Sequence, residues 1–166
     1  MGNVIINLGE EIVGLDMWLY AKQFQWTNWD NKKLEETKTE KVNKILGVKS
    51  QLGKLKEITW EAIYWRKANH IHSWFVNNCQ DGVDECQESD VSVEQLEELR
   101  DICKKIMDNH DLAKELLPTQ VGFFFGGEEY DDYYFQEIEF TYNEILKLLE
   151  NLNKDDKIDF YYRSSW

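Results

Sequence analysis

Three stretches of the chain alternate hydrophobic and polar residues with a period of two, which is typical of half-buried β-strands. They cover residues 14–24, 57–65 and 158–166. In the first stretch, Leu15, Met17 and Leu19 share one face of the expected strand. The middle stretch also fits the beginning of a helix, so its pattern leaves strand and helix both open.

Three further stretches repeat hydrophobic residues at every third or fourth position, as one face of a helix does. They cover residues 66–79, 92–108 and 131–152. Ser92 and Gln95 form a capping box that marks the start of the second helix. A shorter helical turn at 111–117 ends before Pro118, the single proline of the chain.

The segments between these elements have their own signals. Residues 28–56 are polar and rich in lysine, which predicts an exposed insertion, either a hairpin or a loose helix. Residues 77–90 predict a loop with a turn at Asp81-Gly82. Within 121–127, glycines flank three phenylalanines, which favours a short buried strand or a loop that approaches a ligand.

Length and composition fit one folded domain. The chain has 166 residues, of which 42% are hydrophobic and 14% aromatic, so it can bury a sizeable core. Strands at both ends with helices between them predict a single α+β domain at residues 13–166, with a small mixed or antiparallel sheet and about three helices. We expect residues 1–12 to be a translated leader or a disordered N-terminus.

The net charge of −13 is unevenly distributed along the chain. Residues 1–76 hold 11 Lys and Arg against 9 Asp and Glu, whereas residues 77–166 hold 8 against 23. The first part therefore carries +2 and the second −15. An acidic protein is a poor ligand for duplex nucleic acid, because binding there depends on cations that neutralise phosphates. The acid of the second part fits solvated helix faces, although such an asymmetry can also report on a partner.

No stretch of 18 apolar residues and no secretory signal is found, which predicts a protein without membrane contact. The three cysteines, Cys79, Cys86 and Cys103, are an odd number at wide spacing. This pattern is not a disulfide framework and suits a reducing cytoplasm, where we expect them to be buried small hydrophobic residues.

The densest group of functional side chains lies between Tyr64 and Phe75. Arg66 and Lys67 would stand at the start of the expected helix, where free backbone N–H groups and cations together favour an anion such as phosphate. Tyr64 and Trp74 would offer ring faces for a stacked base. The alternative is structural: the aromatic residues belong to the core, and the cations pair with surface acids.

No motif for catalysis, a cofactor or a metal is present. The chain lacks the nucleophile elbow and both common glycine-rich phosphate loops. His70 and His72 are two residues apart and would lie on different faces of a helix, so they do not form a metal pair. His72 as a general base has no partner that the sequence identifies. We therefore expect no cofactor and no metal site, and an enzyme is the weaker class.

Several segments together resemble a family of small uncharacterised proteins encoded by bacteriophages and prophages. The segments are Gly14 to Tyr20, Tyr64 to Phe75, Asn78 to Gly82, Leu116 to Gly126, Tyr130 to Tyr134 and Phe160 to Trp166. The resemblance covers residues 13–166 apart from 28–56. It implies a phage genome context and the cytoplasm of an infected bacterial host, but no known activity.

The resemblance also implies a different start of translation. Members of that family begin with Met-Gly-Leu-Asp-Met, and Val13 stands here in place of that methionine. Gly9-Glu10-Glu11 can be encoded by a purine-rich stretch that resembles a ribosome-binding site. We therefore expect translation to begin at a GUG codon for Val13. Mass spectrometry of protein made from the natural gene tests this, and an intact Met1 terminus contradicts it.

These observations favour a binding protein that sequesters a nucleotide-like anionic signal, as phage sponge proteins do in counter-defence. The expected ligand-binding residues are Tyr64, Arg66, Lys67, Asn69, His72, Trp74, Thr119, Phe124 and Tyr130. One alternative is an acidic inhibitor that imitates nucleic acid and binds a host protein. A second is a small hydrolase or transferase that uses His72. The many aromatic residues also predict a homo-oligomer, because aromatic surface would remain after the core is filled.

Overall fold

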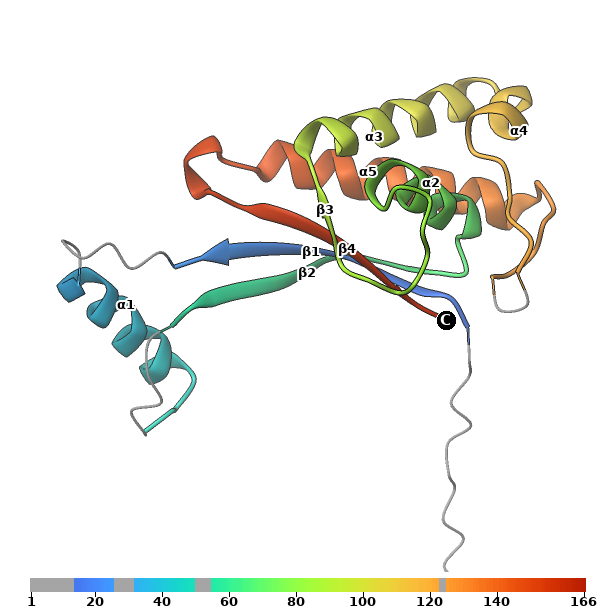
Figure 1. Cartoon of the computed structure of the whole chain (residues 1–166). Helices are drawn as coiled ribbons and strands as arrows, with labels where there is room; N and C mark the ends of the chain where they lie inside the picture. The colour runs from blue at the N-terminus through green and yellow to red at the C-terminus, as the bar shows by residue number, and fades with distance from the viewer. Residues whose placement is uncertain (1–13, 26–31, 50–54, 123–124) are drawn as a thin grey trace, which may run out of the picture.

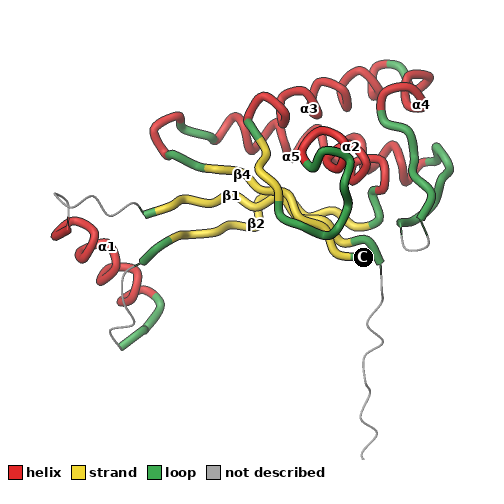
Figure 2. Tube along the Cα trace, in the orientation of Figure 1, coloured by secondary structure: helices red, strands yellow, loops and turns green. Residues whose placement is uncertain are grey.

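The computed structural model describes residues 14–25, 32–49, 55–122 and 125–166, and apart from the helix within 32–49 these form two layers. A four-stranded antiparallel sheet makes one layer. Helices α2, α3 and α5 make the other, and all three lie on the same side of the sheet (Figures 1 and 2). The predicted α+β class with a single small domain is confirmed.

The sheet has the strand order β2-β1-β4-β3. Its strands are β1 (Asp16–Phe24), β2 (Glu57–Arg66), β3 (Ser89–Val91) and β4 (Asp159–Ser165). The alternation that predicted the first and last strands is confirmed, and the ambiguous stretch at 57–65 is a strand. β3 was not predicted, because three residues are too few to show a period of two.

The helices are α1 (Lys32–Ile45), α2 (Asn69–Cys79), α3 (Val93–Asp108), α4 (Ala113–Leu116) and α5 (Asp132–Asn151), with short 3-10 turns at His110–Leu112 and Lys154–Asp156. The capping box of Ser92 and Gln95 is present at the start of α3. The insertion at 28–56 contains a helix. The described residues of 121–127 form no strand.

The prediction that a helix begins at residue 66 is wrong by three residues. Arg66 is still the last residue of β2, and α2 begins only at Asn69. Between them, Lys67 has a φ of 58°, in the left-handed region that side chains other than glycine rarely adopt. This turn at Lys67 redirects the chain from the sheet into the helical layer.

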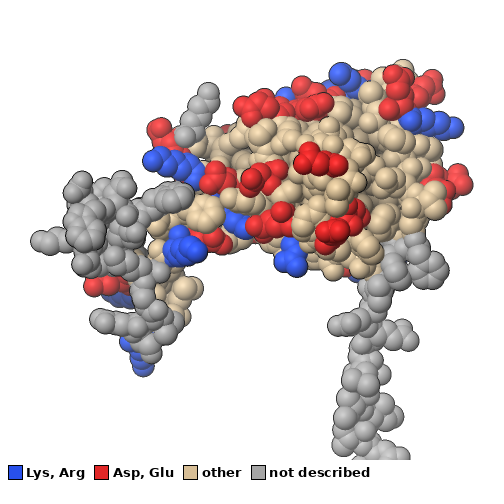
Figure 3. All heavy atoms as spheres, in the orientation of Figure 1, with Lys and Arg blue, Asp and Glu red and all other residues tan. Residues whose placement is uncertain are grey.

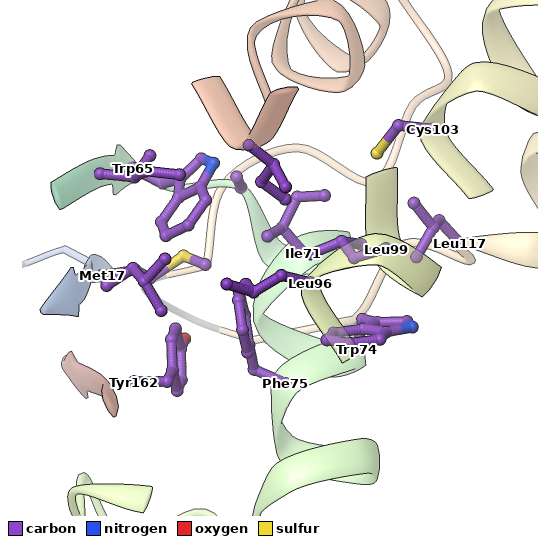
Figure 4. Close-up of a cluster of buried hydrophobic side chains, with 14 of the residues drawn as sticks. Met17, Trp65, Ile71, Trp74, Phe75, Leu96, Leu99, Cys103, Leu117 and Tyr162 are labelled. Atoms are coloured by element: carbon purple, nitrogen blue, oxygen red, sulfur yellow. The ribbon is translucent and has the colours of Figure 1, made fainter. Parts of the chain in front are cut away.

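The core lies between the two layers (Figure 4). Met17 of β1 is fully buried, and it lies opposite Trp65 of β2 and Ser164 of β4. The helical layer contributes the buried faces of α3 and α5. On α3 these residues are Leu96, Leu99, Cys103 and Ile106, and on α5 they are Tyr134, Ile138, Thr141 and Ile145. The period-two and period-3.6 patterns therefore meet in one hydrophobic interface, as a two-layer fold requires.

Helix α2 is the most buried element. All residues from Asn69 to Val76 are buried, so the first two turns are enclosed on every side, and only the end of the helix at Asn77 and Asn78 is exposed. Its Phe75 ring stacks on the Tyr162 ring of β4, with centroids 4.1 Å apart and planes only 8° from parallel. α2 thus connects the sheet to the rest of the helical layer.

The helical layer carries a large share of the acidic residues. α3 and α5 together contain ten Asp and Glu against four Lys and Arg. Figure 3 shows acidic side chains spread over the visible side of this layer. Much of the acid of the second half of the chain therefore lies on helix faces, while none of the described helices covers the outer face of the sheet (Figure 1).

One buried hydrogen bond between the layers gives a stability prediction. The Trp65 indole donates to Thr141 Oγ1 over 2.9 Å, and Thr141 is fully buried. Thr141→Val keeps the shape but leaves the indole N–H without an acceptor, which should cost about 1–3 kcal/mol of unfolding free energy. Urea denaturation measures this cost. Thr59→Val at an exposed position of β2 is the control, and an equal loss in both variants would contradict the prediction.

Candidate functional site

The end of the sheet where β1 begins and β2 and β4 end brings distant parts of the chain together; we call it the strand end. The backbone N–H of Lys67 donates to the carbonyl of Leu15, just before β1. The loop from Thr119 to Asp131 passes over the same turn. A Cβ on Gly126, which has a φ of 97°, would come within 2.9 Å of the Lys67 carbonyl oxygen, so only glycine allows this approach.

Asn69 holds this loop in place. Its side-chain amide donates to the carbonyls of Phe125 and Gly127, at 3.2 and 2.8 Å, and its Oδ1 accepts from the N–H of Gln120 at 2.9 Å. Asn69 is only 2% exposed. Its polar atoms are used within the protein, so Asn69 positions the loop rather than facing a ligand.

Thr119 and Tyr130 close the loop on itself. The Tyr130 hydroxyl accepts from the Thr119 N–H, and the Thr119 hydroxyl donates to the Glu128 carbonyl.

Phe124 lies outside the described residues. Its neighbour Phe125 contacts the His72 ring edge-on, with centroids 5.3 Å apart, and also lies near Trp166 at the end of β4.

His72 has the partners that the sequence did not identify. Its Nε2 lies 2.9 Å from Asp84 Oδ2 and its Nδ1 lies 2.7 Å from the Tyr162 hydroxyl. Because the carboxylate only accepts, Nε2 carries the proton and Nδ1 accepts from Tyr162. Burial lowers the pKa of His72, although Asp84 acts in the opposite direction. The His72 ring is therefore neutral, and it connects the buried Tyr162 hydroxyl to the partly exposed Asp84 carboxylate.

Trp74 is also buried, with 6% of its surface exposed, and it packs edge-on against Phe75. His72 and Trp74 therefore lie in the interior of the protein. This arrangement does not favour the hydrolase interpretation, since a general base has to reach its substrate. Arg66, Lys67 and His72 do not gather around one cavity among the described residues.

Tyr64 and Arg66 lie instead on the open face of the sheet, away from the helices. Their neighbour Trp65 is buried beneath the helices, and alternate residues of a strand point to opposite faces. The Tyr64 hydroxyl donates to Asp16, and this hydrogen bond is the main cause that raises the pKa of Tyr64. Arg66 Nε lies 3.9 Å from the same carboxylate, and the Tyr133 hydroxyl donates to the Arg66 carbonyl.

The strand register adds two residues that the sequence analysis missed. Trp18 of β1 lies opposite Tyr64 of β2 on one side and opposite Arg163 of β4 on the other. The Trp18 and Tyr64 rings have centroids 5.8 Å apart. Arg163 is exposed and makes no ion pair with any residue that the structure describes. We call Trp18, Tyr64, Arg66 and Arg163 the open-face group.

Alternation on the predicted strands did place Trp18 and Arg163 on polar faces. It did not show that these two faces are neighbours, because strand order is not readable from a single sequence. The same limit applies to Asp84 and Tyr162 as partners of His72.

A hollow of about 140 Å³ lies nearby, beside the first turn of α5. Its lining includes Lys67, Asn69, His70 and Tyr133. His70 Nε2 is buried without a hydrogen-bond partner among the described residues. Burial lowers the pKa of His70 to about 3, so its ring is neutral at physiological pH.

The residue types that bind metals, and the cysteine thiols, are the remaining candidates for chemistry. Within the described ranges, no three His, Cys, Asp or Glu side chains are grouped as metal ligands would be. Burial raises the pKa of Cys79 to about 12 and that of Cys103 further, so both thiols stay protonated. No helix in the described part of the chain is long and apolar enough to cross a membrane.

Comparison with known proteins gives no relative. No family model, no curated protein and no solved structure matches this chain.

The two buried histidines predict acid sensitivity. The pKa of His70 falls from about 6.5 in the unfolded chain to about 3 in the fold, so the unfolded state binds more protons between these values. Stability should therefore fall as pH decreases below about 6.5. Between pH 7 and pH 5, His70 alone should account for roughly 2 kcal/mol of that loss.

Urea denaturation of His70→Gln at both pH values measures this contribution. The variant should lose less stability on acidification than the unmodified protein. His110→Gln, which changes an exposed histidine, is the control and should retain the full loss. Identical pH dependence in His70→Gln and the unmodified chain would show that His70 is not the group responsible.

Proposed function

We propose that the protein binds a nucleotide-like anionic small molecule on the open face of its sheet, at the strand end. The observation that carries this proposal is the row formed by Tyr64, Trp18 and Arg163 across three neighbouring strands. It combines two aromatic rings with an arginine on a surface that none of the described helices covers.

The aromatic pair suits a purine or pyrimidine base. Tyr64 is 39% exposed and Trp18 is half-buried, so both have ring surface available on this face. The hydrogen bond from Tyr64 to Asp16 fixes the tyrosine ring before any ligand arrives. A base that stacks on such a ring contributes about 1–3 kcal/mol, and a fixed ring loses less entropy on binding.

The arginines suit the phosphate. Arg163 has no described ion-pair partner, and its planar guanidinium can bind two phosphate oxygens at once. Arg66 contacts Asp16 only at 3.9 Å, and its side chain is 43% exposed, so it remains accessible. Asp16 therefore fixes the Tyr64 ring through its hydrogen bond and leaves the Arg66 guanidinium accessible to a phosphate.

The charge distribution limits the size of the ligand. Further along the same sheet face lie Glu61, Asp90 and Asp159, which pair in register with Tyr20, Tyr161 and Lys22. A long nucleic acid would have to pass over these carboxylates, whereas a small anion at the strand end would not.

The role that fits best is sequestration. The resemblance to phage proteins suggests only the setting, which is the cytoplasm of an infected host. In that setting the protein would capture a nucleotide signal and blunt the response to it. An oligomer would multiply the number of sites per particle. The hollow of about 140 Å³ that Lys67 and Tyr133 line is beside this region and can accept a further part of the ligand.

The acidic helical layer favours a second candidate function. α3 and α5 carry a combined charge of −6, on the side of the molecule opposite to the open face. Such a surface could imitate nucleic acid toward a basic host protein. In that case, reversing charges on α3 would abolish host-protein capture, and changes on the open face would leave it intact.

Isothermal titration calorimetry with cyclic dinucleotides and ADP-ribose tests the first proposal. At least one of these should bind with a Kd below about 10 µM, roughly −7 kcal/mol. Arg163→Ala and Arg66→Ala should each weaken binding at least tenfold, with an unchanged melting temperature, because both side chains are exposed. Arg100→Ala on α3 is the matched control. The proposal fails if nothing binds below this limit, or if the control weakens binding equally.

A further inference from the structure

Helix α1 stands apart from the rest of the molecule. It is inserted at the tip of the hairpin formed by β1 and β2, whose pairing continues to a hydrogen bond from Gln25 N to Lys56 O. Figure 1 shows it beyond the ends of these strands and away from the helical layer. At its end, Ile45 is 83% exposed and Leu46 is 69% exposed. A helix of 14 residues that stands alone has little stability of its own in water, because most helical stability comes from packing.

An apolar groove of about 450 Å³ opens at the same end of the molecule. It runs between the end of α5 and the sheet, and its lining includes Trp60, Ala62, Leu148, Leu152, Ile158 and Phe160. Trp60 is 45% exposed there, although it belongs to a strand and faces the helical side. The groove therefore has an apolar floor that no described segment covers.

We propose that α1 of one molecule docks into the Trp60 groove of a second copy of this chain, through the half-buried Val42 and the exposed Ile45 and Leu46. The apolar surfaces on the helix end and in the groove are then buried together. If the exchange is reciprocal, one two-fold axis generates two identical contacts. This gives the expected homo-oligomer a specific interface, and it is independent of the proposed ligand site.

The charges of the two surfaces are complementary. α1 contains five lysines and three glutamates, a net charge of +2. The segment 150–159, which runs past the groove, contains four acids and two lysines, a net charge of −2. Lys41 and Lys44 on the exposed side of α1 are thus placed to meet acids such as Asp156 at the groove. Opposite charges of this kind set orientation and the rate of encounter.

Geometry favours a second copy over the molecule's own groove. The groove lies on the helical side of the sheet. In Figure 1, α1 lies beyond the tip of the β1–β2 hairpin, on the side of the sheet away from the helical layer. Binding its own groove would require α1 to pass around the tip of its own hairpin. A neighbouring molecule can receive α1 without any rearrangement of the hairpin.

Light scattering after gel filtration, from about 1 to 100 µM protein, tests the interface. The full chain should be a dimer at the upper end of this range. Ile45→Asp should weaken dimerisation at least tenfold, and Trp60→Ala should do the same from the groove side. Val121→Asp is the matched control, because Val121 is 79% exposed on a distant loop. A chain that stays monomeric at 100 µM, or a dimer that Ile45→Asp leaves intact, overturns the proposal.

A mixing experiment separates exchange between molecules from closure within one. The first variant lacks α1, with residues 26–55 replaced by Asn-Gly, a turn that the Gln25–Lys56 pairing accepts. The second variant keeps α1 but has Ala62→Trp to fill the groove. Each should be monomeric alone, and together they should form a one-to-one complex. No complex, with amides of residues 39–48 protected from hydrogen exchange in the monomer, would show that α1 binds its own groove and would overturn the proposal.

Discussion

The burial of the first eight residues of α2 is the constraint on which the rest of the structure depends. Eight consecutive residues of this helix are buried, and they include Asn69, His70, His72 and Ser73. A polar group without water needs a partner inside the protein, and leaving it unsatisfied costs free energy. Asn69 finds its partners in the 119–131 loop and His72 finds them in Asp84 and Tyr162. The loops on both sides of the helix are therefore held by its polar side chains.

This constraint also explains how the strand end is built. The chain has to leave β2 and enter the buried start of α2 within two residues, and the left-handed Lys67 makes that turn possible. The 119–131 loop then crosses the turn at Gly126, where no side chain would fit. Segments more than fifty residues apart become neighbours there. The side chains that remain accessible, Tyr64 and Arg66, are those that alternation directs away from α2.

The molecule is thus divided by charge and by exposure. Its helical layer is acidic, and the open face of the sheet presents aromatic rings and arginines at the strand end. The basic helix α1 lies beyond the opposite end of the strands. The proposed ligand site and the proposed dimer contact lie at opposite ends of the same strands. Each can therefore be altered without disturbing the other, and neither uses the buried hydrogen-bond chain through His72.

The sequence by itself determined the elements whose pattern is local. The period of two in β1 and β4, the stripe of α3 and the cap at Ser92 depend only on neighbours within a few residues, so they could be predicted. Tyr64 and Arg66 could also be selected as candidates. Only the tertiary structure decided that residues 57–66 form a strand, that α2 begins at Asn69, and that Trp18 and Arg163 flank Tyr64. These features depend on which strands pair and which helix is enclosed. Both are decided by contacts between residues that are far apart in the sequence, which a local pattern does not contain.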